Sequence, residues 1–584
     1  MKAMKNREVA MLLREIAEYL TIKGESRFKI SAYERAAHVV ENLTEPIEEI
    51  DARGGLTKLP SVGKSIAEKI HEFLTTGKCT YLEELKREIP PEVFKLMEIP
   101  GIGPKLAMRL YTELGVRSID ELEKAAKEGR IRTMKRMGIK AEQKILKGIE
   151  IYKMDAGRVP LFTIRPLVLE MIDYLMEKTG IEKISPAGSF RRWREDVGDV
   201  DILVATDSEG SRVIELFAGA DWTKEVLWKG ETKCSIVTSS GVQVDLRVVP
   251  TDSWGAALQY FTGSKAHNIR LRELAISKGM KLNEYGLFDE NTGKKIAGES
   301  EEEIYHALGM EWIPPELRED MGEIDKALKG KLPNLVEEKD IKGDIHMHTT
   351  YSDGANSIRE MAVAAKEMGY EWIVVTDHAI GLGVVGGVDF ETWQEEYEEA
   401  KRVEKEIGIR IFVGIEANIM ADGSVMISHP DMDFVIGSIH SGLDGSKDKI
   451  MERYQKAISS GQIDSIGHPT GRLLGGVRPP MDLDMDLLLT MANESGMFME
   501  INSYPNRLDL NGPNVFKAKK LGITLYIGTD SHATMQLHNM VYGVHTARRG
   551  WAERGDLLNT LSAKEMEKLI YSLKKRRSDI TLSY

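Results

Sequence analysis

Apolar positions at the start of the chain follow the period of an amphipathic helix. Val9, Leu12, Ile16 and Leu20 fall on one helical face, which predicts helices over residues 5–42. From there to about residue 157, short helix-like segments alternate with Gly/Pro turns. The pattern therefore predicts a helical region at the N-terminal end.

One segment of this helical region occurs twice. LPSVGKSIAEKI (59–70) matches IPGIGPKLAMRL (99–110) at an offset of 40 residues, with Gly63 and Gly103 in register. Each copy predicts a tight Gly turn between two helices. The duplication indicates two copies of one small structural unit.

The period of the apolar positions changes after residue 160. We expect a helix from Leu167 to Lys178 and strands over 199–206, 232–240 and 242–250. The last strand alternates apolar and polar side chains, as a half-buried strand does. Short helices and hairpin-like pieces follow in residues 255–320.

The last part of the chain predicts a linker followed by a parallel sheet or barrel. Residues 321–341 are rich in Lys, Glu and Asp, which is typical of a linker. Strand-then-helix units follow, and such units build parallel sheets whose strand ends carry polar residues. Their strands read IVVTDH, IRIFVGIEA, FVIGSIH, FMEINSY and LYIGTDSH.

Length and composition indicate several domains and exclude two classes of protein. A chain of 584 residues is too long for one hydrophobic core. No apolar run approaches the roughly 18–20 residues of a membrane span, and the N-terminus lacks the apolar centre of a signal peptide. Cys79 and Cys234 cannot build a disulfide framework, which favours a reducing, cytoplasmic location.

Charge is distributed unevenly. Residues 1–150 hold 28 Lys and Arg against 24 Asp and Glu, a balance of +4. Because the net charge of the whole chain is −13, the other 434 residues carry −17. A mildly basic front on an acidic body suits a protein that binds phosphate with one part and metal with another. Ordinary variation in surface charge explains the same numbers equally well.

The repeated Gly turns are candidate phosphate sites. Such a turn leaves backbone N–H groups facing outward at a helix N-terminus, where phosphate oxygens can accept them. These contacts hold a DNA backbone without reading its sequence; a helical corner that serves only packing is the alternative. Both copies resemble helix-hairpin-helix motifs, and the candidate DNA-binding residues are Gly63, Lys64, Lys69, Gly101, Gly103 and Lys105.

Three aspartates occupy polar positions of the predicted strands. Asp199 and Asp201 are two residues apart on one strand, so their side chains project from the same face. With Asp245 on a further strand they would form a hard oxygen site suited to two Mg²⁺ ions and to nucleotidyl transfer. Upstream, the Gly188-Ser189 turn offers a hydroxyl to a phosphate. The alternative is that the carboxylates merely solvate a strand edge.

Residues 1–320 resemble a family X DNA polymerase of the DNA polymerase beta type. The resemblance rests on the Gly-Ser turn, the aspartate pair, Asp245 and YFTGS (260–264), which stand at the family's spacing. It implies that Asp199 and Asp201 ligate both metals, whereas Asp245 ligates the catalytic metal and favours loss of the 3′-hydroxyl proton. The other implied contacts are Gly188, Ser189, Arg192 and Arg158 for the triphosphate, Tyr260, Phe261 and Gly263 for the sugar, Asn268 for the base and Arg272 for the template strand.

Four positions depart from that resemblance. Gln243 stands where the beta-like pattern has an arginine, so the electrostatics at the primer end should differ, and Lys265 replaces an acidic residue, which should strengthen dNTP binding. Lys69 matches the Schiff-base lysine of beta-like lyase domains. Because Phe28 and Ser65 replace its supporting polar or basic residues, a DNA-phosphate contact is favoured over lyase chemistry.

Histidines are concentrated in the second half, where nine of the chain's 13 lie beyond residue 340. Six of them follow apolar runs, so they should gather at the C-terminal ends of barrel strands, together with three acidic residues. Imidazole and carboxylate suit Zn²⁺, Mn²⁺ or Fe, up to three ions, in a site that hydrolyses phosphate esters. The nine candidate ligands are His346, His348, Asp353, His378, Glu416, His440, His468, Asp530 and His532, whereas His429, His538 and His545 are expected to be surface or packing residues.

Residues 341–575 resemble the PHP (polymerase and histidinol phosphatase) domain. The match covers the HxH pair, TDH, the isolated Glu, two later histidines and the final DxH. It implies that Glu416 bridges two metals, and that Asp353, His378 and His532 hold a third. Arg472 and Arg507 are candidate phosphate contacts.

These patterns predict a multidomain α+β and α/β chain, with a helical helix-hairpin-helix region, a nucleotidyltransferase palm with a mixed sheet, and a distorted (β/α)-barrel. The predicted boundaries are 1–90 for a DNA-end-binding domain, 91–157 for a second helical subdomain, 158–259 for the palm, 260–320 for a nucleotide-selecting subdomain, 321–340 for a linker and 341–584 for the PHP domain.

The predicted function is gap-filling DNA synthesis in base excision repair by a cytoplasmic bacterial or archaeal type of enzyme. The expected cofactors are two Mg²⁺ in the palm and up to three Mn²⁺ or Zn²⁺ in the PHP domain. The expected partners are gapped or primed duplex DNA and dNTPs, with no membrane, and the chain is expected to act as a monomer. The PHP domain would supply a 3′–5′ exonuclease or an abasic-site endonuclease. A small-molecule phosphatase tethered to a DNA-binding module and a DNA-binding scaffold without chemistry are the alternatives.

Overall fold

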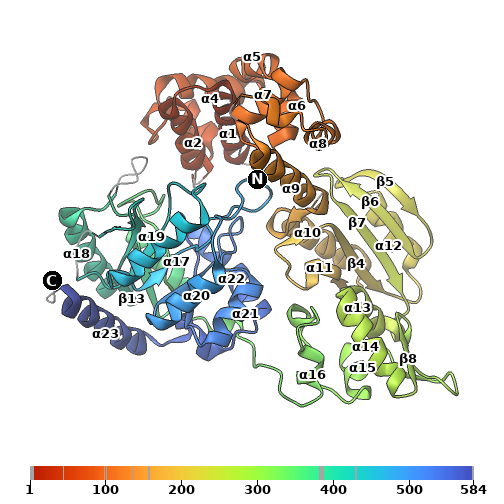
Figure 1. Ribbon diagram of the computed structural model, residues 1–584. Helices are drawn as coiled ribbons and strands as arrows, with labels where there is room; N and C mark the ends of the chain where they lie inside the picture. The colour runs from red at the N-terminus through yellow and green to blue at the C-terminus, as the bar shows by residue number, and fades with distance from the viewer. Residues whose placement is uncertain are drawn as a thin grey trace.

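The computed structural model describes residues 5–581 apart from 42, 44, 98, 100, 136, 156–157, 381–386 and 428–430. Figure 1 shows N-terminal helices at the top, a sheet-containing polymerase-like half on the right and a barrel-like half on the left. This arrangement confirms the multidomain fold class predicted from the sequence. No helix among the described residues is both long and apolar enough to cross a membrane.

The N-terminal region is entirely helical in its described part. One continuous apolar cluster runs from Val9 to Ile149, so the two predicted helical subdomains share a core. Its helices are α1 (Asn6–Lys23), α2 (Arg27–Glu41), α3 (Ile47–Ala52), α4 (Lys64–Thr76), α5 (Thr80–Glu88), α6 (Pro91–Met97), α7 (Pro104–Leu114), α8 (Ile119–Lys127) and α9 (Ile139–Asp155).

The two repeated segments form the same turn. The amide of Val62 donates to the carbonyl of Leu59 in the first, and the amide of Ile102 donates to that of Ile99 in the second. Gly63 and Gly103 then cap α4 and α7. A third turn with the same hydrogen bond joins Met137 to Met134 before α9. It was not predicted from the sequence, where Lys135 stands in place of the proline that both other copies have.

The palm is built on a five-stranded mixed sheet in the order β2-β4-β7-β6-β5. Strands β4 and β7 run parallel, and every other neighbouring pair is antiparallel. The strands are β2 (Ile184–Pro186), β4 (Asp199–Ala205), β5 (Thr223–Lys229), β6 (Lys233–Thr238) and β7 (Gln243–Val249), with helices α10 (Leu161–Thr179), α11 (Gly188–Arg191) and α12 (Gly210–Ala218). A short ladder of β1 (Val159–Pro160) and β3 (Asp196–Val197) holds the entry to α10.

A helix-and-hairpin subdomain follows the palm. It consists of α13 (Trp254–Thr262), α14 (Lys265–Ser277), β8 (Met280–Asn283), β9 (Gly286–Asp289), β10 (Lys295–Ala297), α15 (Glu301–Ala307) and α16 (Glu323–Ala327). The predicted linker is packed, since Ile324 and Ala327 lie in the same apolar cluster as Leu335 and the distant Trp551. Five of its apolar residues are buried although charged residues surround them in the sequence.

The second half closes into a distorted barrel of mainly parallel strands. β11 (Gly343–Asp344), β12 (Trp372–Val375) and β13 (Arg410–Val413) form one sheet. The other holds β15 (Val425–Met426), β14 (Ile415–Ile419), β16 (Val435–Ser438), β17 (Ser465–Ile466), β18 (Phe498–Asn502) and β19 (Leu525–Gly528). Bridges between His378 and Glu416 and between Met347 and Ser531 join the two sheets at both seams.

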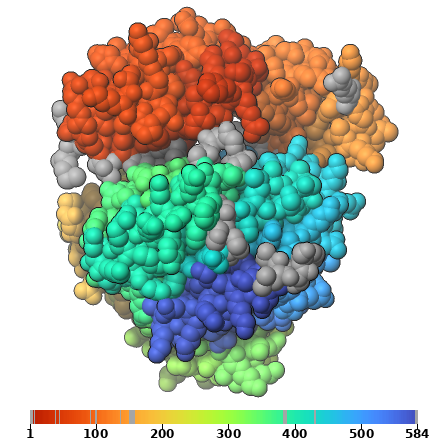
Figure 2. All heavy atoms as spheres, turned by 90° about the vertical axis from the view of Figure 1, so that its left-hand side faces the viewer, coloured from red at the N-terminus to blue at the C-terminus, as the bar shows by residue number. Residues whose placement is uncertain are grey.

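Helices cover the outside of the barrel. They are α17 (Ile358–Glu367), α18 (Phe390–Ile407), α19 (Lys447–Ser459), α20 (Met485–Glu494), α21 (Gly512–Leu521), α22 (Met540–Arg549) and α23 (Ala563–Thr581). Figure 2 shows the N-terminal helices lying across the top of the barrel and the green subdomain below it. The N-terminal region, the polymerase-like half and the barrel therefore lie close to one another.

Candidate active sites of the palm and the barrel

The three palm aspartates lie on adjacent parallel strands. Asp201 of β4 is directly opposite Asp245 of β7 in the sheet register, and Asp199 lies two residues before Asp201 on the same strand. The same pairing places Gln243 opposite Asp199. Register, rather than sequence proximity, thus brings two separated segments to one edge.

The electrostatics of this edge favour a cation. Burial, followed by the charge of Asp199, raises the pKa of Asp201 to about 6. Burial acts to raise the pKa of Asp245 as well, but hydrogen bonds, the largest from Gln243 and Lys233, hold it below its usual value. The Lys233 ammonium lies 3.0 Å from the Asp245 carboxylate. Among the described residues these three aspartates do not converge as tightly as the barrel ligands do.

The Gly-Ser turn lies against the aspartates. Gly188 has a positive φ of 62°, and a Cβ atom there would lie 3.2 Å from an Asp201 carboxylate oxygen. Glycine is therefore required both by the left-handed backbone and by the close approach. Ser189, the predicted hydroxyl donor, follows directly in α11 and is partly buried.

Arg192, the predicted triphosphate contact, is almost completely buried. Its Nη1 donates to the carbonyl oxygen of Thr262 at 2.5 Å, and its Nε donates to Glu319 at 3.1 Å. A Cβ atom on Gly263 would lie 3.2 Å from the same Nη1. The guanidinium thus lies against the YFTGS turn.

The other predicted nucleotide contacts line the region between palm and α13. The Tyr260 and Phe261 rings meet edge to face at 5.1 Å, and Arg247 stacks on Phe261 at 4.6 Å. The Asn268 amide donates to the Tyr260 carbonyl at 2.7 Å. Arg158 pairs with Asp196 at 2.9 Å. Asp196 lies at the start of β3, four residues after Arg192.

Arg272 and Lys265 lie on α14. Arg272 is exposed, and its one described hydrogen bond runs to the Asn268 carbonyl at 3.2 Å. Lys265 is exposed at the first position of the helix. Both are accessible to a nucleic acid.

The hairpin residues face solvent. Gly63, Gly101 and Gly103 have open space where a side chain would be, and Lys64 and Lys105 are exposed. Lys69 is partly buried, donates to the Ser65 hydroxyl at 2.9 Å and lies 4.6 Å over the Tyr81 ring. The backbone amides of both turns are therefore available to a phosphate.

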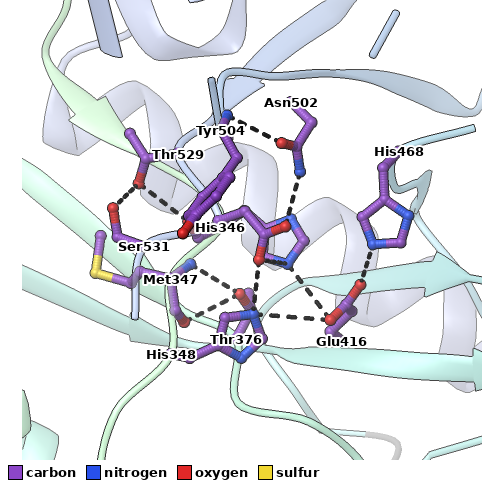
Figure 3. Close-up of polar contacts among 12 residues, drawn as sticks. His346, Met347, His348, Thr376, Glu416, His468, Asn502, Tyr504, Thr529 and Ser531 are labelled. Atoms are coloured by element: carbon purple, nitrogen blue, oxygen red, sulfur yellow. Dashed lines mark hydrogen bonds and ion pairs between the residues drawn. The ribbon is translucent and has the colours of Figure 1, made fainter. Parts of the chain in front are cut away.

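In the barrel, Glu416 is surrounded by histidines (Figure 3). One carboxylate oxygen lies 2.8 Å from His468 Nε2 and 3.1 Å from His440 Nε2. The other lies 2.9 Å from His378 Nδ1 and 3.6 Å from His346 Nε2. The strand order brings these residues together from five separate segments.

The remaining predicted ligands complete the cluster. Asp530 lies 3.2 Å from His348 Nε2, and Asp353 lies 3.3 Å from His532 Nε2. Three groups have ligand atoms within 4.8 Å of one another: His348, Asp353, His378 and His532; His346, His348 and Asp530; and His378, Glu416 and His440. All nine predicted residues therefore lie in one site.

The donor atoms of this site suit metal ions. Buried nitrogens of His346, His348 and His378 and one oxygen of Glu416 have no hydrogen-bond partner in the part of the chain that the structure describes. Burial, with His532 and His378 beside it, lowers the pKa of His348 to about 4, so its ring is neutral near pH 7. Neutral imidazole is the form that binds a metal. Unpaired buried donors of this kind are costly unless a ligand satisfies them.

Two residues that position the predicted ligands, Glu500 and Asn418, were not predicted from the sequence. Glu500 is fully buried, accepts from His346 Nδ1 at 2.6 Å and also accepts from the His468 amide. Asn418 accepts from His440 Nδ1 at 2.7 Å. Both follow or precede apolar strand residues, and a lone acidic residue inside FMEINSY was the available signal for Glu500.

The two predicted phosphate-binding arginines differ in their surroundings. Arg472 is buried and pairs with Glu195 of the palm through both terminal nitrogens, at 2.9 and 2.6 Å. Its guanidinium is therefore held by a carboxylate and by backbone carbonyls. Arg507 lies beside the cluster, 3.3 Å from Asp530. His545 packs on Trp193, whereas His429 lies outside the described residues.

Four family descriptions match parts of the chain. "Helix-hairpin-helix domain" matches residues 4–79, and "SAM-like Helix-hairpin-helix tandem" matches residues 93–150. "DNA polymerase beta thumb" matches residues 257–319, and "PHP domain" matches residues 344–504.

Curated relatives match nearly the whole chain or about half of it. The chain is 36% identical over 570 residues to "DNA polymerase/3'-5' exonuclease PolX" of Bacillus subtilis (strain 168), covering 97% of this chain and 99% of that protein. It is 28% identical to DNA polymerase lambda of Arabidopsis thaliana and 25% identical to DNA-directed DNA/RNA polymerase mu of Homo sapiens, each over 54% of this chain. These two alignments cover 62% of the lambda relative and 69% of the mu relative.

Proposed function

We propose, from the premise that the chain belongs to the family X DNA polymerases that carry a C-terminal PHP domain, that it extends DNA primers in its palm and removes nucleotides from 3′ ends in its barrel. The observation that carries the proposal is the presence of two separate clusters of potential metal ligands in one chain. One is the Asp201–Asp245 pair in parallel register, and the other is the buried cluster around Glu416.

In the palm, Asp199, Asp201 and Asp245 would hold the divalent ions, which we propose to be two Mg²⁺. Such ions supply positive charge that favours loss of the 3′-hydroxyl proton and stabilises the leaving pyrophosphate. The raised pKa of Asp201 supports this assignment, because a bound cation would offset both the burial of this carboxylate and its repulsion by Asp199.

The other palm residues would bind and orient the nucleotide. Ser189 and Arg192 would hold the triphosphate, together with Arg158, which pairs with Asp196 close to them. Tyr260 and Phe261 would contact the sugar, and the exposed Arg272 would reach the template strand. The support lies in their position around the YFTGS turn.

In the barrel, the nine clustered ligands would hold up to three Mn²⁺ or Zn²⁺ ions. Such ions supply an activated hydroxide and neutralise the phosphodiester charge. Glu500 and Asn418 would fix the orientation of the His346 and His440 rings, and Arg507 at the rim would contact the DNA phosphate.

The helical region would hold the DNA through the exposed amides of its hairpins. Two or more such turns grip the backbone independently of sequence, which supports repair of short gaps, as in base excision repair. Lys69 is assigned a phosphate contact rather than lyase chemistry, because its ammonium is bound to Ser65 and stacked on Tyr81.

Reciprocal substitutions test the assignment of the two sites. In the full chain, Asp199→Ala with Asp201→Ala should abolish extension of a gapped, end-labelled duplex and leave 3′–5′ degradation intact. His346→Ala should stop degradation and leave extension intact. Persistent extension in the first variant would mean that the palm site is assigned wrongly. A barrel that hydrolyses histidinol phosphate faster than DNA would favour a small-molecule phosphatase.

A further inference from the structure

A loop of the palm is held by residues of the barrel. Trp193 stacks on His545 with ring centres 3.6 Å apart and planes at 7°. Glu195 receives Arg472 from the barrel. The barrel side of this contact is mainly α22, which faces the palm in Figure 1. The loop that carries Arg192 is therefore shaped by the other catalytic half.

The last residue of α22, Arg549, reaches Arg192 in two ways. Its Nη1 donates to the main-chain carbonyl oxygen of Arg192 at 2.6 Å. The same nitrogen donates to Glu319 at 3.1 Å. Because Glu319 also accepts from Arg192 Nε at 3.1 Å, one carboxylate oxygen is shared by two arginines.

The sharing determines how strongly Glu319 holds Arg192. The three side chains are only 10–17% exposed, so little water screens their charges. With Arg549 present, the group carries two positive charges and one negative charge. Arg192 Nη2 takes part in none of the hydrogen bonds among the described residues, so this edge is available for a substrate oxygen.

We propose that Arg549 is a positioning residue for nucleotide binding in the palm, acting across the domain boundary by neutralising Glu319 and fixing the Arg192 main chain. The inference rests on the proposed role of Arg192 as a triphosphate contact. Without Arg549, Glu319 has Arg192 as its main counter-charge. The carboxylate then competes with the triphosphate for the same guanidinium.

The test is steady-state primer extension by full-length variants. Arg549→Met should raise the KM for dNTP by about tenfold, the effect of one charged hydrogen bond, with a smaller change in kcat. Arg549→Lys should recover part of the loss. Exonuclease activity on the same duplex should remain within about twofold of that of the parent protein. A twofold change corresponds to only about 0.4 kcal/mol.

A neighbouring arginine provides the matched control. Arg548 lies on the same helix, is similarly buried and crosses the same domain boundary, but it binds Glu316 and the Val336 carbonyl. Arg548→Met should loosen the interface without raising the KM for dNTP. An equal rise in KM for both variants would overturn the proposal in favour of general loosening.

A second variant separates electrostatics from structural damage. Adding Glu319→Gln to Arg549→Met removes the competing carboxylate, so the KM for dNTP should return toward that of the parent protein. A double variant worse than Arg549→Met would overturn the proposal.

The outcome for Arg192 distinguishes the two levels of inference. Arg192→Met should raise the KM for dNTP more than any variant above. If it does not, the proposed triphosphate role fails; if it does while Arg549→Met leaves the KM unchanged, only the role of Arg549 fails.

Discussion

Replacing Glu500 by Gln should weaken metal binding in the barrel without affecting the palm. The carboxylate is fully buried and uses both oxygens, one on His346 Nδ1 at 2.6 Å and the other on the His468 amide. Gln keeps the shape but offers one oxygen, so one of these two donors must face an NH₂ group. The two predicted ligand rings would lose part of their fixed orientation.

The magnitude follows from the kind of bond that is lost. Removing a group that orients a ligating histidine lowers metal affinity by roughly 10–100-fold, which corresponds to about 1.4–2.7 kcal/mol. The Mn²⁺ concentration that half-saturates exonuclease activity should rise by that factor. Activity should recover at high Mn²⁺, because no predicted ligand has been removed.

The assay is a Mn²⁺ titration of 3′–5′ degradation, with primer extension in Mg²⁺ measured in parallel. Glu323→Gln is the matched control, since Glu323 is also fully buried and accepts from a histidine, His267, at 2.7 Å, but in the polymerase half. It should destabilise the protein without shifting the Mn²⁺ titration. A lower maximal rate for Glu500→Gln at an unchanged half-saturating concentration would refute the reasoning.

Two further predictions concern stability and DNA binding. Burial acts to raise the pKa of Glu316, but His545 and Arg548 lower it from 4.5 to about 2. The ionised carboxylate therefore stabilises the folded protein by on the order of 3 kcal/mol. This stabilisation is complete above pH 4.5 and is lost as the pH falls toward 2. Thermal unfolding across this range should show a smaller decline in Glu316→Gln than in the parent protein, and equal slopes would contradict the assignment. Lys69→Ala should weaken DNA binding and reduce the slope of log K against log salt by about 1, whereas covalent trapping of a DNA aldehyde by borohydride through Lys69 would show that the residue performs lyase chemistry.

The sequence was most informative where chemistry follows a strand. Each of the six predicted ligand histidines follows an apolar run, and parallel strands bring such residues to one end of a barrel. The alternation around Asp245 likewise predicted which face of β7 would carry the carboxylate. In both cases local pattern and long-range geometry are linked by the regularity of the sheet.

The rest depends on packing between distant segments. Arg549 and Arg192 are 357 residues apart, and no local pattern indicates that they meet. Arg472 is a predicted phosphate contact, and the sequence does not show that its guanidinium pairs with the distant Glu195 of the palm. The charged composition of residues 321–341 predicted a linker, because its five buried apolar residues are scattered among many charged ones and give no clear period.

Trp551 has a consequence for dissecting this protein into fragments. It belongs to the barrel half of the sequence but lies in the apolar cluster of the α13–α16 subdomain, with Leu335. The backbone amide of Val336 also donates to the Ala552 carbonyl. A polymerase fragment that ends before the barrel would lose a buried tryptophan, and the loss of such a side chain costs roughly 3–5 kcal/mol. Poor activity of that fragment would therefore measure an opened core, whereas point substitutions in the intact chain report on each active site separately.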